Sequence, residues 1–122
     1  MRGSMHKAVI VDDDHLNLRV LSAMLSQFGY EVFTAGTGSE GVDLVKEVQP
    51  DIVMMDLLMP FATLDGSAAT RAIQETTQGA HIPIIAVSAA DIQTIRDMIN
   101  EGLFYDFIQK PITVEKLEAL LE

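Results

Sequence analysis

Short apolar runs alternate with amphipathic stretches five times along the chain. Each run is closed by polar or glycine-containing residues, and the runs cover residues 8–11, 31–35, 52–55, 82–87 and 104–109. Most of these runs are almost wholly apolar, which is typical of strands covered on both faces of a parallel sheet. The stretches between them repeat apolar side chains with the spacing of amphipathic helices. The pattern predicts five strand–helix repeats and therefore a single-sheet, doubly wound α/β fold.

The ends of several predicted helices carry recognisable signals. Asp14 can cap the first helix and Gly29 ends it, whereas Ser39 is the candidate cap of the second helix. Gly102 closes the fourth helix, and the last helix begins near Thr113. These capping and stop residues support the same alternation of strands and helices.

The composition limits the size of the fold. With 122 residues and 48% hydrophobic content, the chain can bury one core of ordinary size, so we expect a single domain. Residues 1–4 read as an expression-vector scar before a second methionine, Met5, and residues 5–122 as the domain.

The charge and the cysteine count exclude several classes of function. The formal charge of −10 makes the surface repel nucleic-acid phosphates and anionic membranes, so we expect no direct nucleic-acid binding. No apolar run is long enough to span a bilayer. The sequence has no cysteine, which excludes disulfides and thiolate metal sites and suits a reducing compartment. We therefore expect a cytoplasmic protein with no membrane contact.

Polar residues follow four of the five predicted strands. Parallel strands joined by right-handed crossovers bring all their carboxyl ends to one edge of the sheet, where ligands of open α/β sheets bind. The residues at these four strand ends are Asp12 with Asp13, then Asp56, Ser88 and Lys110. Three carboxylates at one partly desolvated edge repel one another, and a divalent cation would remove that cost. Because the available ligands are oxygens only, they favour magnesium over zinc.

Magnesium beside a carboxylate and a lysine fits phosphoryl transfer, which mostly requires charge neutralisation in a fixed geometry. Asp56 is the candidate nucleophile, since carboxylates can form acyl phosphates. Lys110 would place a positive charge beside a phosphoryl oxygen, and Ser88 would donate a hydrogen bond to another.

Four motifs carry a resemblance to a known family. They read Val-Ile-Val-Asp-Asp-Asp at residues 9–14, Met-Met-Asp-Leu-Leu-Met-Pro at 54–60, Ala-Val-Ser-Ala at 86–89 and Ile-Gln-Lys-Pro-Ile at 108–112. In this order and spacing, the chain from Lys7 onward resembles the CheY-like receiver domain of two-component response regulators. The resemblance implies a flavodoxin-like sheet of five parallel strands in the order 2-1-3-4-5, flanked by five helices.

The resemblance also implies roles for the residues at the strand ends. Asp56 would be the phosphoacceptor and Lys110 the lysine of the family pattern. Asp13 would bind magnesium directly, Asp12 chiefly through a water molecule, and the main-chain carbonyl of Leu58 would complete the protein's ligands. The family implies no enzymatic activity beyond the domain's own phosphorylation and dephosphorylation.

The resemblance further implies a conformational switch and two kinds of partner. Ser88 and Phe107 match the hydroxyl and the aromatic ring that move inward after phosphorylation, and the bond between Lys110 and Pro111 is expected to be cis. The phosphoryl group would come from a histidine kinase or a histidine phosphotransfer protein. A downstream effector protein or domain would read the switch.

Two stretches depart from the family pattern. The segment 61–64 makes the loop after Pro60 about two residues longer than usual, which surface loops tolerate at little cost. Leu58 and Ala90 stand where family members often influence the hydrolytic water, and neither side chain can form a hydrogen bond. We therefore expect slow self-dephosphorylation.

Two other functions compete with this interpretation. A haloacid-dehalogenase-like phosphohydrolase would use an Asp-x-Asp signature after the first strand, which Asp12 and Asp14 satisfy, but it would leave Asp56 without a role. A receiver-like module that docks without phosphorylation would be expected to lack one of Asp13, Asp56 and Lys110. The sequence is compatible both with a stand-alone regulator and with a receiver from a hybrid kinase or a longer regulator.

Overall fold

The computed structural model describes residues 6–57, 66–76, 81–88 and 92–121. Its strands are β1 (His6–Val11), β2 (Tyr30–Ala35), β3 (Ile52–Asp56), β4 (Ile84–Ser88) and β5 (Asp106–Gln109). Its helices are α1 (His15–Gln27), α2 (Gly38–Val48), α3 (Gly66–Gln74), α4 (Ile92–Asn100) and α5 (Val114–Leu121). The strands form one sheet in the order β2-β1-β3-β4-β5, and every neighbouring pair is parallel. The predicted fold and strand order are confirmed.

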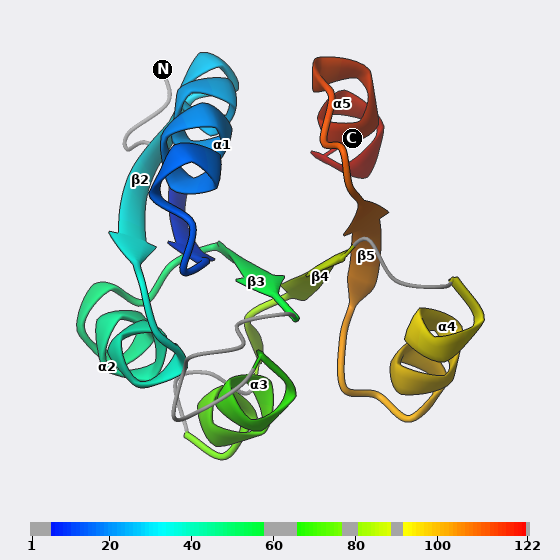
Figure 1. Cartoon of the computed structure of the whole chain (residues 1–122). Helices are drawn as coiled ribbons and strands as arrows, with labels where there is room; N and C mark the ends of the chain where they lie inside the picture. Colours follow the sequence, from blue (N-terminus) through cyan, green and yellow to red (C-terminus); the bar gives the residue numbers. More distant parts are fainter. Residues whose placement is uncertain (1–5, 58–65, 77–80, 89–91, 122) are drawn as a thin grey trace.

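Helices cover both faces of the sheet. Figure 1 shows α1 and α5 on one side and α2, α3 and α4 on the other. Successive residues of β1 point to opposite faces: Val9 and Val11 pack into the core under α2 and α3, whereas Ala8 and Ile10 pack under α1 and α5. This double burial explains why the strands read as unbroken apolar runs. Within the described ranges, no helix is both long and apolar enough to cross a membrane.

The predicted cap of α1 is confirmed, and that of α2 is wrong. Asp14 caps α1 and accepts hydrogen bonds from the backbone N–H of Leu16 and Asn17. The second helix begins at Gly38, and its cap is Thr37, whose Oγ1 accepts a bond from the N–H of Glu40 at 3.1 Å. Thr37 and Glu40 have the spacing of a capping box, so the threonine outcompetes Ser39, which lies within the first turn.

Two strands begin later than the apolar pattern predicts. The strand predicted at 82–87 is Ile84–Ser88 in the structure. It starts late because Pro83 has no N–H to donate to a neighbouring strand, although the Pro83 carbonyl accepts a hydrogen bond from the N–H of Val53. The strand predicted at 104–109 is Asp106–Gln109 in the structure. Phe104 is apolar because it packs into the core from the segment that precedes the strand.

Close packing of α2 on β1 predicts a sensitive position at Gly41. A Cβ atom built on Gly41 would lie 2.6 Å from Cγ2 of Val11, a stiff, fully buried side chain in the strand that leads to Asp12. We expect Gly41→Ala to lower the free energy of unfolding by about 1–3 kcal/mol through overpacking, despite the better helix propensity of alanine. Urea denaturation measures the change. The exposed Ser39→Ala in the same helix is the control, and a Gly41→Ala variant as stable as this control would contradict the packing argument.

Candidate functional site

The carboxyl ends of four strands meet at one edge of the sheet. Asp12 follows β1 directly, and its N–H donates to the carbonyl of Ala35 at the end of β2. Asp56 is the last residue of β3 and pairs in register with Val87 of β4. The N–H of Lys110, just past β5, donates to the carbonyl of Ser88 at 2.9 Å. The backbone ladder therefore fixes the strand-end residues relative to one another, as the sequence predicts.

Asp12, Asp13 and Asp56 form an acid cluster. Each offers a carboxylate oxygen, and the three oxygens lie within 4.8 Å of one another. The residues Asp12 and Asp56 are only 5% and 2% exposed, and Asp13 is half-buried. At such a separation two ionised carboxylates near a protein surface repel each other by roughly 3 kcal/mol. The cluster therefore stores considerable electrostatic repulsion unless a cation joins it.

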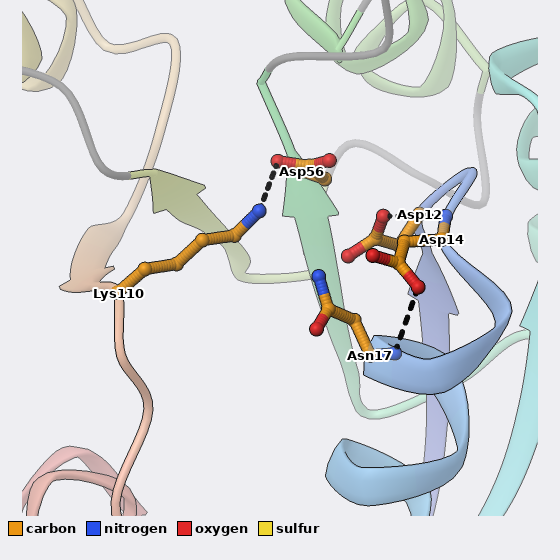
Figure 2. Close-up of polar contacts among 5 residues, drawn as sticks. All are labelled: Asp12, Asp14, Asn17, Asp56 and Lys110. Carbon is orange, nitrogen blue, oxygen red and sulfur yellow. Dashed lines mark hydrogen bonds and ion pairs between the residues drawn. The ribbon is translucent and has the colours of Figure 1, made fainter.

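Lys110 places one positive charge beside the acid cluster. Its Nζ lies 3.3 Å from Oδ1 of Asp56 and forms both an ion pair and a hydrogen bond with it (Figure 2). The lysine reaches the cluster from the side of β5, opposite to the side from which Asp12 approaches. One ammonium against three ionised carboxylates leaves two negative charges uncompensated among these four residues.

The acid cluster fits a magnesium ion by charge and by donor chemistry. The two uncompensated negative charges match a divalent cation, and carboxylate oxygens are the ligands that magnesium prefers. Within the part of the chain that the structure describes, this cluster is the only group of three acidic, histidine or cysteine side chains close enough to share an ion. The carbonyl of Leu58, the fourth expected ligand, lies outside the described residues.

Asp14 takes no part in the acid cluster. Its carboxylate caps α1, while its N–H donates to Oδ1 of Asp12 at 3.0 Å. This bond orients the Asp12 carboxylate, and the cap directs the Asp14 side chain to the helix. The second aspartate of an Asp-x-Asp signature is thus committed to a structural role, which counts against the phosphohydrolase interpretation.

The two expected switch residues lie on neighbouring strands. Ser88 ends β4 and is nearly buried, and it pairs in register with Gln109. Phe107 of β5 is partly buried and packs against the core on the side of α2 and α3. The bond between Lys110 and Pro111 is cis, as expected. Ala90 and the loop after Pro60 lie outside the described residues.

Asn17 is a site residue that the sequence analysis missed. It lines the same cavity as Asp12, Asp56 and Lys110, and Figure 2 shows its side chain rising from the first turn of α1 toward the space between Lys110 and Asp12. The prediction for this helix considered only apolar positions. A polar residue in the first turn after the run of aspartates was the signal that could have identified Asn17.

Comparisons with known proteins agree on one family. The sequence matches the family described as response regulator receiver domain over residues 8–122. It is 34% identical over 113 residues to the protein PilH of Pseudomonas aeruginosa, covering 93% of this chain and 92% of PilH. It is 33% identical to the polar-differentiation response regulator DivK of Brucella ovis, covering 92% of this chain and 90% of DivK.

Solved structures give the same result. The chemotaxis protein CheY4 of Vibrio cholerae superposes with a TM-score of 0.86 at 25% identity, with 97% of each chain covered. The receiver domain of a Pseudomonas aeruginosa sensor histidine kinase, with magnesium coordinated in its active-site cleft, gives a TM-score of 0.84 at 30% identity, covering 98% of this chain and 95% of that one. The chain therefore belongs to the response regulator receiver domain family.

Proposed function

We propose that this domain is a phosphorylation-operated switch of a cytoplasmic two-component phosphorelay, and that Asp56 accepts the phosphoryl group from a histidine kinase or a histidine phosphotransfer protein. One observation carries the proposal: the nearly buried Asp56 carboxylate lies between Lys110, at 3.3 Å, and the carboxylates of Asp12 and Asp13. A nucleophile between a fixed cation and a cation-binding pair is the arrangement that phosphoryl transfer requires.

Each residue of the site has a distinct task in this mechanism. An Asp56 carboxylate oxygen attacks phosphorus, and the donor's leaving group departs from the opposite side. Lys110, already paired with Asp56, shifts its ammonium to a phosphoryl oxygen and loses no salt-bridge partner. Asp12, Asp13, Asp56 and the Leu58 carbonyl would hold magnesium, which supplies positive charge for the phosphoryl oxygens when bound.

Phosphorylation then shifts the domain between two conformations. The phosphoryl oxygens favour the state in which the Ser88 hydroxyl hydrogen-bonds to them, and Phe107 follows inward. Ser88 and Lys110 are joined through the backbone bond between β4 and the residue after β5. Through this hydrogen bond, a movement of Ser88 also moves the end of β5 and its flanking helices, where a downstream effector would bind. Receiver domains act as signalling switches rather than as enzymes that turn over a separate substrate.

Intact-mass spectrometry tests the proposed function. Incubation with acetyl phosphate and magnesium is expected to add one phosphoryl group to the native chain and none to Asp56→Asn, which keeps the size of the side chain. Chelation of magnesium is expected to prevent the addition. Labelling of Asp56→Asn would reject the assignment, and release of many phosphate molecules per chain would favour a phosphohydrolase. Failure of the native chain to be labelled would favour the phosphorylation-independent docking module.

A further inference from the structure

The main chain on the amino side of Lys110 has one peptide group that faces two ways. Lys110 follows β5, which ends the order of the described strands and pairs only with β4. The N–H of Lys110 donates to the carbonyl of Ser88 at 2.9 Å, so it points toward β4. In a trans peptide group the carbonyl points opposite to the N–H, so the Gln109 carbonyl faces the open edge of the sheet. An edge carbonyl of this kind finds no donor within the sheet.

Lys116 supplies a donor from the first turn of α5. Its Nζ donates to the Gln109 carbonyl at 3.1 Å and to the Pro111 carbonyl at 2.9 Å. These two carbonyls lie on either side of Lys110, so one ammonium bridges the main chain before and after it. Both bonds are charge-assisted, since an ammonium is the donor. The peptide group that leads into Lys110 is therefore held at both ends, its N–H by β4 and its carbonyl by Lys116.

The first turn of α5 is itself fixed to the fold. The N–H of Lys116 donates to Oγ1 of Thr113 at 3.1 Å, and the N–H of Leu117 donates to the Thr113 carbonyl at 3.0 Å. Leu117 is fully buried and packs into the core under α1 and α5. The exposed Lys116 side chain thus extends from an anchored backbone, so its ammonium can hold the segment after β5 in place.

We propose that Lys116 is a positioning residue for Lys110: it holds the main chain on both sides of Lys110 so that the Lys110 ammonium stays beside Asp56. The inference rests on the proposed function, because this ammonium is the one that stabilises the phosphoryl oxygens. The direction of the Lys110 side chain follows from the peptide groups around its Cα, and its Nζ lies 3.3 Å from Asp56 (Figure 2). A tilt of those groups moves an ammonium at the end of a long side chain by more than it moves the backbone. Because phosphoryl transfer requires charge in a fixed place, its rate should depend on Lys116.

Single-turnover labelling with acetyl phosphate and magnesium tests the inference. Lys116→Met keeps the length of the side chain and removes both hydrogen bonds, and we expect it to slow labelling of Asp56 roughly three- to tenfold. Lys116→Arg, which can still donate to both carbonyls, should keep most of the native rate. Lys46→Met is the control, because it removes the same charge from another exposed helical position, and it should be labelled at the native rate.

A double-mutant cycle distinguishes positioning from a general structural or charge effect. Because Lys116 acts through Lys110, adding Lys116→Met to Lys110→Ala should slow labelling no further. The slowing caused by Lys116→Met alone should persist in high salt, which screens the field of a distant charge but does not restore a lost hydrogen bond. Additive effects of the two variants, or a Lys116→Met effect that disappears in high salt, would overturn the proposal.

Nuclear magnetic resonance of the resting domain separates this inference from the proposed function, because it needs no phosphoryl donor. The two protons on Cε of Lys110, assigned by their absence in Lys110→Ala, should have distinct chemical shifts in the native chain and in Lys46→Met, since the side chain is held in one orientation. In Lys116→Met the two shifts should converge. Convergence without labelling of Asp56 by any donor would reject phosphorylation while keeping the positioning role. Labelling of the native chain, with shifts and rate unchanged in Lys116→Met, would reject the positioning role and keep the proposed function.

Discussion

Lys110→Ala is expected to slow phosphorylation of Asp56 by about 10²–10³-fold, the usual effect of removing one fixed donor to a developing oxyanion. The ammonium lies 3.3 Å from Asp56 and is the cation nearest to it among the described residues. Without it, the three carboxylates of the acid cluster carry one negative charge more than a divalent ion neutralises, and the incoming phosphate adds further negative charge. Single-turnover labelling with acetyl phosphate measures the rate.

The matched variant Lys110→Arg separates charge from geometry. Arginine keeps the positive charge but places it in a planar fork rather than a compact ammonium, so an intermediate rate is expected. Circular dichroism confirms that both variants remain folded before their rates are compared. Equal labelling rates for the native chain and Lys110→Ala would show that the lysine serves only to offset the charge of Asp56 in the resting state.

Magnesium is expected to stabilise the folded domain through the acid cluster. At a magnesium concentration a hundred times its dissociation constant, the free energy of unfolding should rise by about 2.7 kcal/mol. Asp13→Asn should abolish most of this gain. The same variant should be more stable than the native chain without magnesium, by about 1–3 kcal/mol, because it removes repulsion between carboxylates within 4.8 Å of one another. Urea denaturation with and without magnesium measures both effects.

Asp14→Asn is the control for the magnesium prediction. It removes the same charge one position along the chain, yet asparagine caps helices about as well as aspartate, so the cap on α1 should be retained. We expect its magnesium dependence to match that of the native chain. If Asp13→Asn and Asp14→Asn respond alike, the metal effect arises from the general negative charge of the surface and not from the acid cluster.

Much of the fold follows from the sequence because a parallel sheet restricts which residues its strands and connecting helices can contain. Strands buried on both faces must be continuous apolar runs, and the crossovers between them need helices with recognisable ends. Asp14 at one end of α1 and Gly29 at the other behave as predicted, and Gly29 and Gly102 adopt positive φ values of 89° and 81°. One error occurs where two residues of similar chemistry compete, as Thr37 and Ser39 do. The other errors lie at the starts of β4 and β5, where apolar residues continue beyond the strand.

The meeting of the strand-end residues was also predictable, whereas the shape of the site was not. All carboxyl ends of parallel strands share one edge, so residues following the strands had to meet, and Asp12, Asp56 and Lys110 do so. The contact between Lys110 and Asp56 depends on how a long side chain crosses that edge. Asn17 carries a local signal, as a polar residue in the first turn of α1, whereas the cavity that it lines depends on how α1 lies against the segment after β5, which no local pattern encodes.

The position of the phosphoryl group is the sharpest test of Asp56 as the phosphoacceptor. After incubation with acetyl phosphate and magnesium, borohydride reduction converts an aspartyl phosphate to homoserine, and peptide mass spectrometry then locates the converted residue. Homoserine is expected at position 56 alone, with Asp12 and Asp13 unchanged. Homoserine at Asp12 or Asp13, or a stable phosphoryl group on a serine, threonine or histidine with residue 56 still aspartate, would contradict it.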